Sequence, residues 1–98
     1  MNIDFSNIKN KLTDSYWNFL HYGGTYLIMR THEPDWLAHY LEPLLPRGIT
    51  IDQTPAQNFT HSEKGPSVEL STHRGTKADE WLRNFIEAGQ FQKVPYMN

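Results

Sequence analysis

The fold is decided by residues 16–31, which read YWNFLHYGGTYLIMRT. Aromatic and β-branched side chains are frequent on both sides of Gly23 and Gly24. Two such runs joined by two glycines are typical of a β-hairpin, because a two-residue primed turn requires positive φ angles at its centre. The stretch therefore predicts strands near residues 15–22 and 25–32.

The expected turn also predicts which side chains share a face of this hairpin. It pairs Phe19 with Ile28 and Trp17 with Arg30, and successive pairs point to opposite sides. The outer side then carries five side chains: Trp17, Phe19, Tyr26, Ile28 and Arg30. The inner side, which carries Leu27, is also apolar, so both sides of the hairpin need a cover.

A helix is expected before the hairpin. Phe5, Ile8 and Leu12 follow one another at intervals of three and four residues, the spacing of one helical face. This spacing predicts a helix near residues 4–12. We expect the helix to cover part of the hairpin's outer side, and a protein partner to cover the rest.

Two longer apolar stripes predict two further helices. The first begins at Pro34, which is tolerated in a first turn, and ends near Glu42 because Pro43 disfavours helical geometry there. The second begins after Thr76, a capping residue, and ends at Gly89, where we expect a left-handed backbone conformation.

Two short segments between these helices alternate apolar and polar residues. They are Ile49–Asp52 and Val68–Ser71, and the alternation is typical of half-buried strands. The loop that joins them, Thr54–Pro66, is polar and long for a hairpin, as functional or disordered loops are.

The two later helices share a sequence pattern. Residues 35–42 (DWLAHYLE) and 80–87 (EWLRNFIE) both read acid, Trp, Leu, two variable positions, aromatic, aliphatic, Glu. Each is preceded by a strand that ends in Thr-His. The chain therefore reads as two ββα units. The similarity between them arises either from a duplication or by chance.

The pattern predicts a single α+β domain over residues 1–98. It divides into an N-terminal helix (1–14), a first ββα unit (15–46), a second ββα unit (47–89) and a tail or short strand (90–98). Two ββα units most easily form a four-stranded antiparallel sheet with two helices on one face. The arrangement is a circular permutation of the ferredoxin-like fold, or that fold itself if the tail replaces residues 16–22 as a strand.

Composition argues against several classes of function. Nine Lys and Arg against eleven Asp and Glu leave a formal net charge of −2, whereas nucleic-acid binders usually carry a basic surplus. There is no cysteine, which excludes disulfides and thiol nucleophiles. With no long apolar run and no signal-peptide pattern, we expect a cytoplasmic protein without a membrane partner.

Metal and catalytic chemistry find little support in the sequence. His32 and His73 each follow a strand, but in adjacent antiparallel strands they lie at opposite ends, about 20 Å apart. Asp52 and Glu69 are a possible same-face cross-strand pair, which alone is weak support for acid–base catalysis. We expect no cofactor, no metal and no catalytic residue.

One segment is a candidate for binding a small anion. His73 and Arg74 precede the helix that begins after Thr76, and helix N-termini attract anions while Arg adds bidentate hydrogen bonds. Helix capping by Thr76 is the simpler explanation for this segment.

The leading hypothesis is a non-enzymatic interaction module. It would form a homodimer, or bind or inhibit a heterologous protein, through the outer side of the first hairpin. The partner-binding residues would be Trp17, Phe19, Tyr26, Ile28 and Arg30. The alternative is a small-molecule or anion-binding protein, possibly an enzyme, that uses His73, Arg74 and Thr76.

Overall fold

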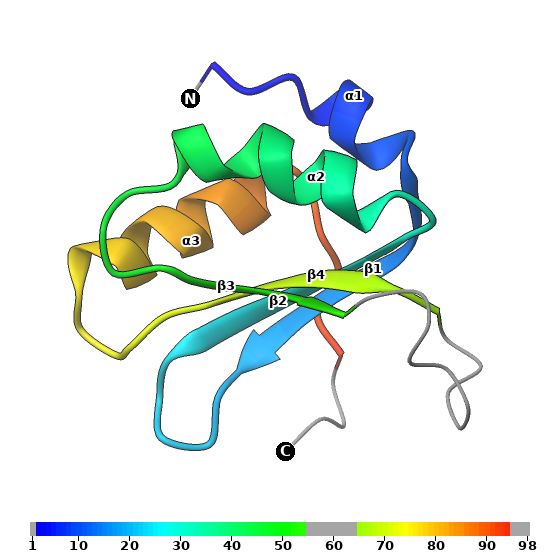
Figure 1. The fold of residues 1–98 in the computed structure, drawn as a ribbon. Helices are drawn as coiled ribbons and strands as arrows, with labels where there is room; N and C mark the ends of the chain where they lie inside the picture. The colour runs from blue at the N-terminus through cyan, green and yellow to red at the C-terminus, as the bar shows by residue number, and fades with distance from the viewer. Residues whose placement is uncertain (1, 55–64, 95–98) are drawn as a thin grey trace.

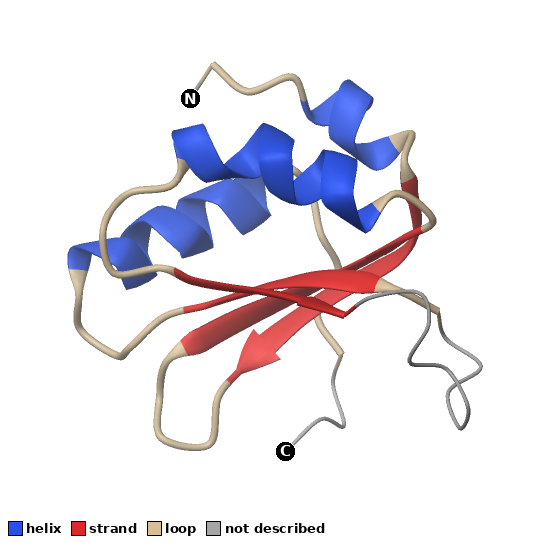
Figure 2. Cartoon of the chain, in the orientation of Figure 1, coloured by secondary structure: helices blue, strands red, loops and turns tan. Residues whose placement is uncertain are grey.

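The computed structural model describes residues 2–54 and 65–94, which form an antiparallel sheet and several helices (Figures 1 and 2). The elements are α1 (Phe5–Lys9), β1 (Leu12–Phe19), β2 (Thr25–Thr31), α2 (Pro34–Leu41), the 3-10 turn η1 (Glu42–Leu44), β3 (Thr50–Thr54), β4 (Ser67–Ser71) and α3 (Lys77–Ala88). The expected α+β class with a four-stranded antiparallel sheet is confirmed.

The strands lie in the order β1-β2-β4-β3. The central pair, β2 and β4, is antiparallel and places Ile28 opposite Glu69. The three α-helices lie on one side of the sheet (Figure 2). The other side of the sheet is called the open face below.

The core lies between the sheet and the helices. Alternation along the central strands directs one set of side chains toward the helices. This set and the helix residues that meet it are fully buried: Leu27, Met29, Val68, Leu70, Leu37, Leu41, Leu82 and Phe85. Burying each of these side chains contributes roughly 1.5–3 kcal/mol to stability relative to leaving it exposed. This layer therefore holds one face of the sheet against the helices.

The N-terminal helix is shorter than expected and lies on the helical side of the sheet (Figure 1). Asp4 caps it by accepting a hydrogen bond from the backbone N–H of Asn7, at 3.2 Å. Ile8 is fully buried in the core, and the ring of Phe5 lies 5.0 Å from that of Phe85. The prediction that this helix covers the outer side of the first hairpin is therefore wrong.

The first hairpin has a different turn from the one expected. Leu20 donates its N–H to the carbonyl of Gly24 at 2.6 Å, and its own carbonyl accepts the N–H of Gly23 at 2.9 Å. Gly23 has a φ of 101°, so it supplies the left-handed residue of a three-residue loop. The prediction of a two-residue Gly-Gly turn is therefore wrong.

Gly24 is required for a different reason. A Cβ atom at this position would overlap the carbonyl oxygen of Thr72, at the end of the neighbouring strand β4. The second glycine therefore permits close approach of two backbones and does not set the turn.

The new turn shifts the register of β1 by three residues. Phe19 pairs with Thr25 instead of Ile28, and Trp17 pairs with Leu27. An odd shift moves every side chain of a strand to the opposite face. Trp17 and Phe19 therefore share the side of Leu27, which faces the core.

The described part of the tail runs along the edge of β1. Trp17 donates its N–H to the carbonyl of Gln92 at 2.9 Å and accepts the N–H of Val94 at 3.0 Å, forming a parallel bridge with Lys93. The tail thus adds a short edge pairing beside β1 and does not replace it. Most of the expected loop, and the last residues of the tail, lie outside the described residues.

Candidate functional site

The strand registers place four side chains in one row across the open face. Tyr16 lies opposite Ile28, Ile28 opposite Glu69, and Glu69 opposite Asp52. In an antiparallel sheet with one solvated face, outward positions are usually polar. Here the row runs from an aromatic and an aliphatic side chain to two carboxylates.

A pocket of about 360 Å³ lies on this face, beside the first hairpin loop. It is lined by Leu20, Tyr22, Tyr26, Ile28, Asp52, Glu69, Leu70 and Ser71. Tyr22 lies in the three-residue loop and Leu20 directly precedes it, so the turn that sets the register of β1 also forms one wall of the pocket. Tyr22 is 68% exposed, which makes it the most accessible large side chain at this site.

The acidic end of the row consists of two carboxylates that no described cation neutralises. Within residues 2–54 and 65–94, neither Asp52 nor Glu69 forms an ion pair. Glu69 accepts one long hydrogen bond, 3.5 Å from the Ser67 hydroxyl. Like charges directly opposite each other destabilise a strand pair, so this arrangement opposes folding.

Among the outward positions of the four strands the one cation is Arg30, and its side chain is directed toward β1. Its Nη2 atom donates to the Tyr16 hydroxyl at 3.0 Å, and its Nε atom lies 4.0 Å from the carboxylate of Asp14. The guanidinium carbon also lies 5.7 Å from the centre of the Tyr16 ring. Arg30 is therefore engaged with β1, and no Lys or Arg of the described residues pairs with the two carboxylates on β3 and β4.

The Tyr26 side chain adds a buried polar group to the pocket wall. The residue is 9% exposed, and its hydroxyl has no hydrogen-bond partner among the described residues. Burial, together with Tyr16 and Glu69, raises the pKa of this phenol above its usual 10.0. The group thus stays neutral at physiological pH and has hydrogen-bonding capacity that the described fold does not use.

The five residues expected to form one partner-binding surface are divided between two sides. Tyr26, Ile28 and Arg30 lie on the open face, as expected. Trp17 and Phe19 lie on the other side, because of the register shift. The predicted stack of Trp17 on Arg30 is replaced by Tyr16 on Arg30, which the same strand supplies one residue earlier.

Trp17 and Phe19 form an aromatic pair at the edge of the sheet. Their ring centres lie 5.1 Å apart in an edge-on arrangement. Lys93 lies 4.8 Å from the Phe19 ring, and Arg83 approaches the same ring at 4.9 Å. This cluster joins the tail and α3 to β1, which is a structural role for two of the expected binding residues.

The segment expected to bind an anion is occupied by helix capping. The Thr76 hydroxyl accepts the backbone N–H of Asp79 at 3.1 Å and donates to the His73 carbonyl at 2.8 Å. Asp79 and Glu80 place two carboxylates in the first turn of α3, where they compete with any anion. Arg74 and His73 are exposed.

The sequence reasoning missed a buried polar cluster around Asp79. This residue is 5% exposed, and it accepts hydrogen bonds from the hydroxyls of Thr25, at 2.7 Å, and Thr72, at 2.8 Å. Arg83, one helical turn later, lies 3.2 Å from its second oxygen. The spacing of Asp79 and Arg83 was the available signal. The cluster joins the start of α3 to the ends of β2 and β4.

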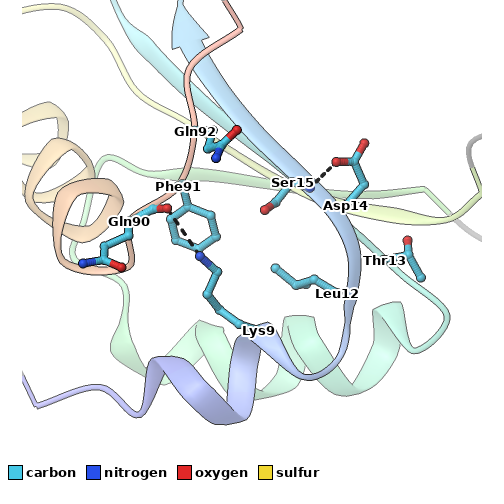
Figure 3. Close-up of a pocket in the computed structure, with 8 residues that line it drawn as sticks. All are labelled: Lys9, Leu12, Thr13, Asp14, Ser15, Gln90, Phe91 and Gln92. Carbon is cyan, nitrogen blue, oxygen red and sulfur yellow. Dashed lines mark hydrogen bonds between the residues drawn. The ribbon is translucent and has the colours of Figure 1, made fainter.

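A second pocket, of about 330 Å³, lies between the start of β1 and the segment that follows α3 (Figure 3). Its charged groups already have partners. Lys9 donates to the carbonyls of Gly89, at 2.8 Å, and Gln90, at 3.4 Å, while Asp14 accepts the N–H of Ser15. The pocket therefore offers less unused binding capacity than the open face.

The described residues contain no cluster of three metal-binding side chains, and none of their helices could span a membrane. No model of a protein family, no curated protein and no solved structure matches the chain.

Proposed function

We propose that this protein is an interaction module that binds a segment of a partner protein on its open face. The observation that carries the proposal is the pocket of about 360 Å³ on the side of the sheet away from the helices. Apolar and aromatic side chains line it: Tyr22 is mostly exposed, whereas Tyr26 and Ile28 occupy outward positions of β2 and are buried in its wall. Concave sites that combine apolar and aromatic walls with a few polar groups are typical binding sites.

The residue types at the site also support a protein ligand. Tyrosine and arginine are enriched in interface hot spots, because a large rigid side chain contributes contact area at low conformational-entropy cost. Tyr22 and Tyr26 line the pocket, and Tyr16 lies in the adjacent row with Arg30 bonded to it.

A heterologous partner is favoured over a second copy of the chain. A symmetric dimer would present the same face twice. The outward positions of the four strands carry Asp14, Asp52 and Glu69 but one cation, Arg30, which its own protomer already engages. A second copy that packs these strands face to face therefore brings carboxylates toward carboxylates, with no free cation at the outward positions of the described strands.

The proposal is tested by selecting displayed random peptides on the full chain. Binding of a selected peptide is then mapped by the shifts it causes in backbone amide NMR signals. We expect the shifts to centre on Leu20, Tyr22, Tyr26 and Ile28. Tyr22→Ala should weaken binding at least about tenfold, the loss typical of a hot-spot aromatic.

The matched control is Leu44→Ala, which truncates another exposed apolar side chain, on the helical side of the molecule. It should leave peptide affinity unchanged. Peptides that bind on the helices, or equal losses for both variants, would contradict the proposal. Sedimentation equilibrium provides a second check, since a dimer broken by Tyr22→Ala would identify a second copy as the occupant.

We also propose that the architecture is a circular permutation of the ferredoxin-like fold. The strand order β1-β2-β4-β3, with a helix after β2 and another after β4, supports this assignment. The assignment implies no function by itself, because such folds carry many unrelated activities.

A further inference from the structure

We infer that the partner segment presents an arginine whose guanidinium group enters the open-face pocket beside Asp52 and Glu69. This inference rests on the proposed function, because it names the chemistry that the same face would recognise. Three independent features of the pocket support it: unneutralised charge, an unused hydrogen-bonding group and an aromatic wall.

The negative charge of the pocket favours a positively charged ligand. Asp52 and Glu69 lie directly opposite each other, and Asp52 is exposed, so a ligand can reach the pair from solvent. Within the described chain, no Lys or Arg forms an ion pair with either carboxylate. A cation placed between them would turn a repulsive pair into two attractive contacts.

The Tyr26 hydroxyl points to a ligand independently of the carboxylates. It is buried in the pocket wall without a hydrogen-bond partner in the described chain, and a group left this way costs about 1–3 kcal/mol. Solvent does not reach its oxygen in the free protein, so a donor in the pocket can bond to it only by displacing the groups that cover it. A phenol with the usual pKa of 10.0 is already neutral at neutral pH, and burial raises the pKa of Tyr26 further.

The number and geometry of acceptors favour arginine over lysine. Asp52, Glu69 and Tyr26 together offer more acceptor positions than the three N–H bonds of an ammonium group can fill. A guanidinium group has five donors in a rigid plane, and it binds carboxylates through parallel hydrogen bonds. A lysine in the same place would leave some of these acceptors unused.

The aromatic wall suits the flat faces of the same group. Tyr22 lines the pocket and is mostly exposed, so its ring is free to stack on a ligand. Stacking of a guanidinium group on an aromatic ring contributes roughly 0.5–1 kcal/mol at an exposed site. The chain already shows this contact on the same face, between Arg30 and Tyr16.

The first experiment titrates the isotope-labelled full chain with short blocked alanine peptides that carry one central residue. The central residue is Arg, Lys, Gln or Glu. We expect the Arg peptide to shift the amide signals of Tyr26, Asp52 and Glu69, with a dissociation constant on the order of 1 mM. The Lys peptide should bind several-fold more weakly, and the Gln and Glu peptides should cause no shifts there.

Three charge-removing variants test the recognition groups. Asp52→Asn and Glu69→Gln should each weaken the Arg peptide about tenfold, the scale of a hydrogen bond to a charged group. Glu80→Gln makes the same chemical change at an exposed position on α3 and should have no effect. If all three variants weakened binding of the Arg peptide equally, the cause would be long-range electrostatics and the inference would be wrong.

The two proposals fail in different ways. If display-selected peptides bind the open face but lose no affinity when their arginines become glutamine, the arginine inference is wrong and the interaction module stands. If no peptide of any composition shifts the open-face signals, the interaction module itself is wrong.

Discussion

Asp52 lies directly opposite Glu69 in the β3–β4 pair, so two carboxylates face each other on an exposed part of the sheet. No described cation neutralises them, and an unpartnered phenol, Tyr26, lies at the same pocket. Both features lower the stability of the fold. Binding surfaces commonly retain such unfavourable groups because function depends on them. Replacing them then stabilises the protein but weakens its function.

We predict that Asp52→Asn or Glu69→Gln stabilises the free protein. Each variant removes the repulsion between opposed carboxylates, which is worth roughly 0.2–1 kcal/mol in a strand pair. The gain should appear in urea unfolding at low ionic strength and shrink at high ionic strength, because salt screens exposed charges. Loss of stability in either variant would mean that the carboxylates have a favourable partner.

We predict that Tyr26→Phe raises the free energy of unfolding by about 1 kcal/mol at neutral pH. The variant removes a buried hydroxyl that lacks a hydrogen-bond partner among the described residues and keeps the ring. Tyr22→Phe is the control, since that residue is mostly exposed and its hydroxyl is expected to interact with water. Equal effects of the two variants in urea unfolding would contradict the prediction.

The same variant should change the alkaline limb of the stability profile. Burial raises the pKa of Tyr26 in the folded protein above 10.0, so the unfolded chain loses this proton at a lower pH. The free energy of unfolding must then fall as the pH rises through 10 toward the folded pKa. Tyr26→Phe lacks this loss, and its advantage over the natural protein should widen above pH 10. A constant difference across the pH range would show that Tyr26 titrates normally.

We predict that Asp79→Ala destabilises the fold by about 3 kcal/mol. The side chain accepts two short hydrogen bonds from buried threonines, and hydrogen bonds to charged groups contribute about 1.5–3 kcal/mol. The ion pair with Arg83 adds little, because the arginine side chain is 47% exposed. Glu80→Ala, at an exposed neighbour, should cost well under half as much in thermal or urea unfolding.

We predict that Gly24→Ala is far more disruptive than Gly75→Ala. The new Cβ at Gly24 would overlap the Thr72 carbonyl, and the two backbones are tied by the hydrogen bond from the Thr72 N–H to the Thr25 carbonyl, at 2.9 Å. We expect Gly24→Ala to lower the free energy of unfolding by about 3 kcal/mol, the upper end of the range for overpacked sites. At Gly75 nothing lies within 4 Å of the new Cβ, so only the positive φ opposes the substitution. Gly75→Ala should therefore lower the free energy of unfolding by about 1 kcal/mol.

Much of the architecture could be predicted from local patterns. Alternation gave β3 and β4 and predicted that Asp52 and Glu69 share a face, which the register confirms. Capping chemistry placed the start of α3, where Thr76 accepts the N–H of Asp79 as expected. These features depend on neighbours a few residues apart, so their physical cause is visible in the sequence.

The meaning of two glycines was decided by tertiary structure. Gly24 was expected to form a turn, and Gly89 was expected to adopt a left-handed conformation. Gly24 instead admits the Thr72 backbone, and Gly89 has a φ of −85° while its missing Cβ leaves room for the rings of Phe5 and Phe91. A sequence marks where a side chain is excluded, but not whether backbone conformation or a distant neighbour excludes it.

The sequence by itself determined the class of this protein: periodicity of two and of 3.6 residues specifies four strands and the helices that cover them. Only the tertiary structure decided the open face. A turn one residue longer moved Trp17 and Phe19 toward the core, brought Tyr16 to the surface and set Leu20 and Tyr22 beside the pocket. The physical reason is that a strand's faces alternate with a period of two, so a small change in one loop exchanges all its contacts.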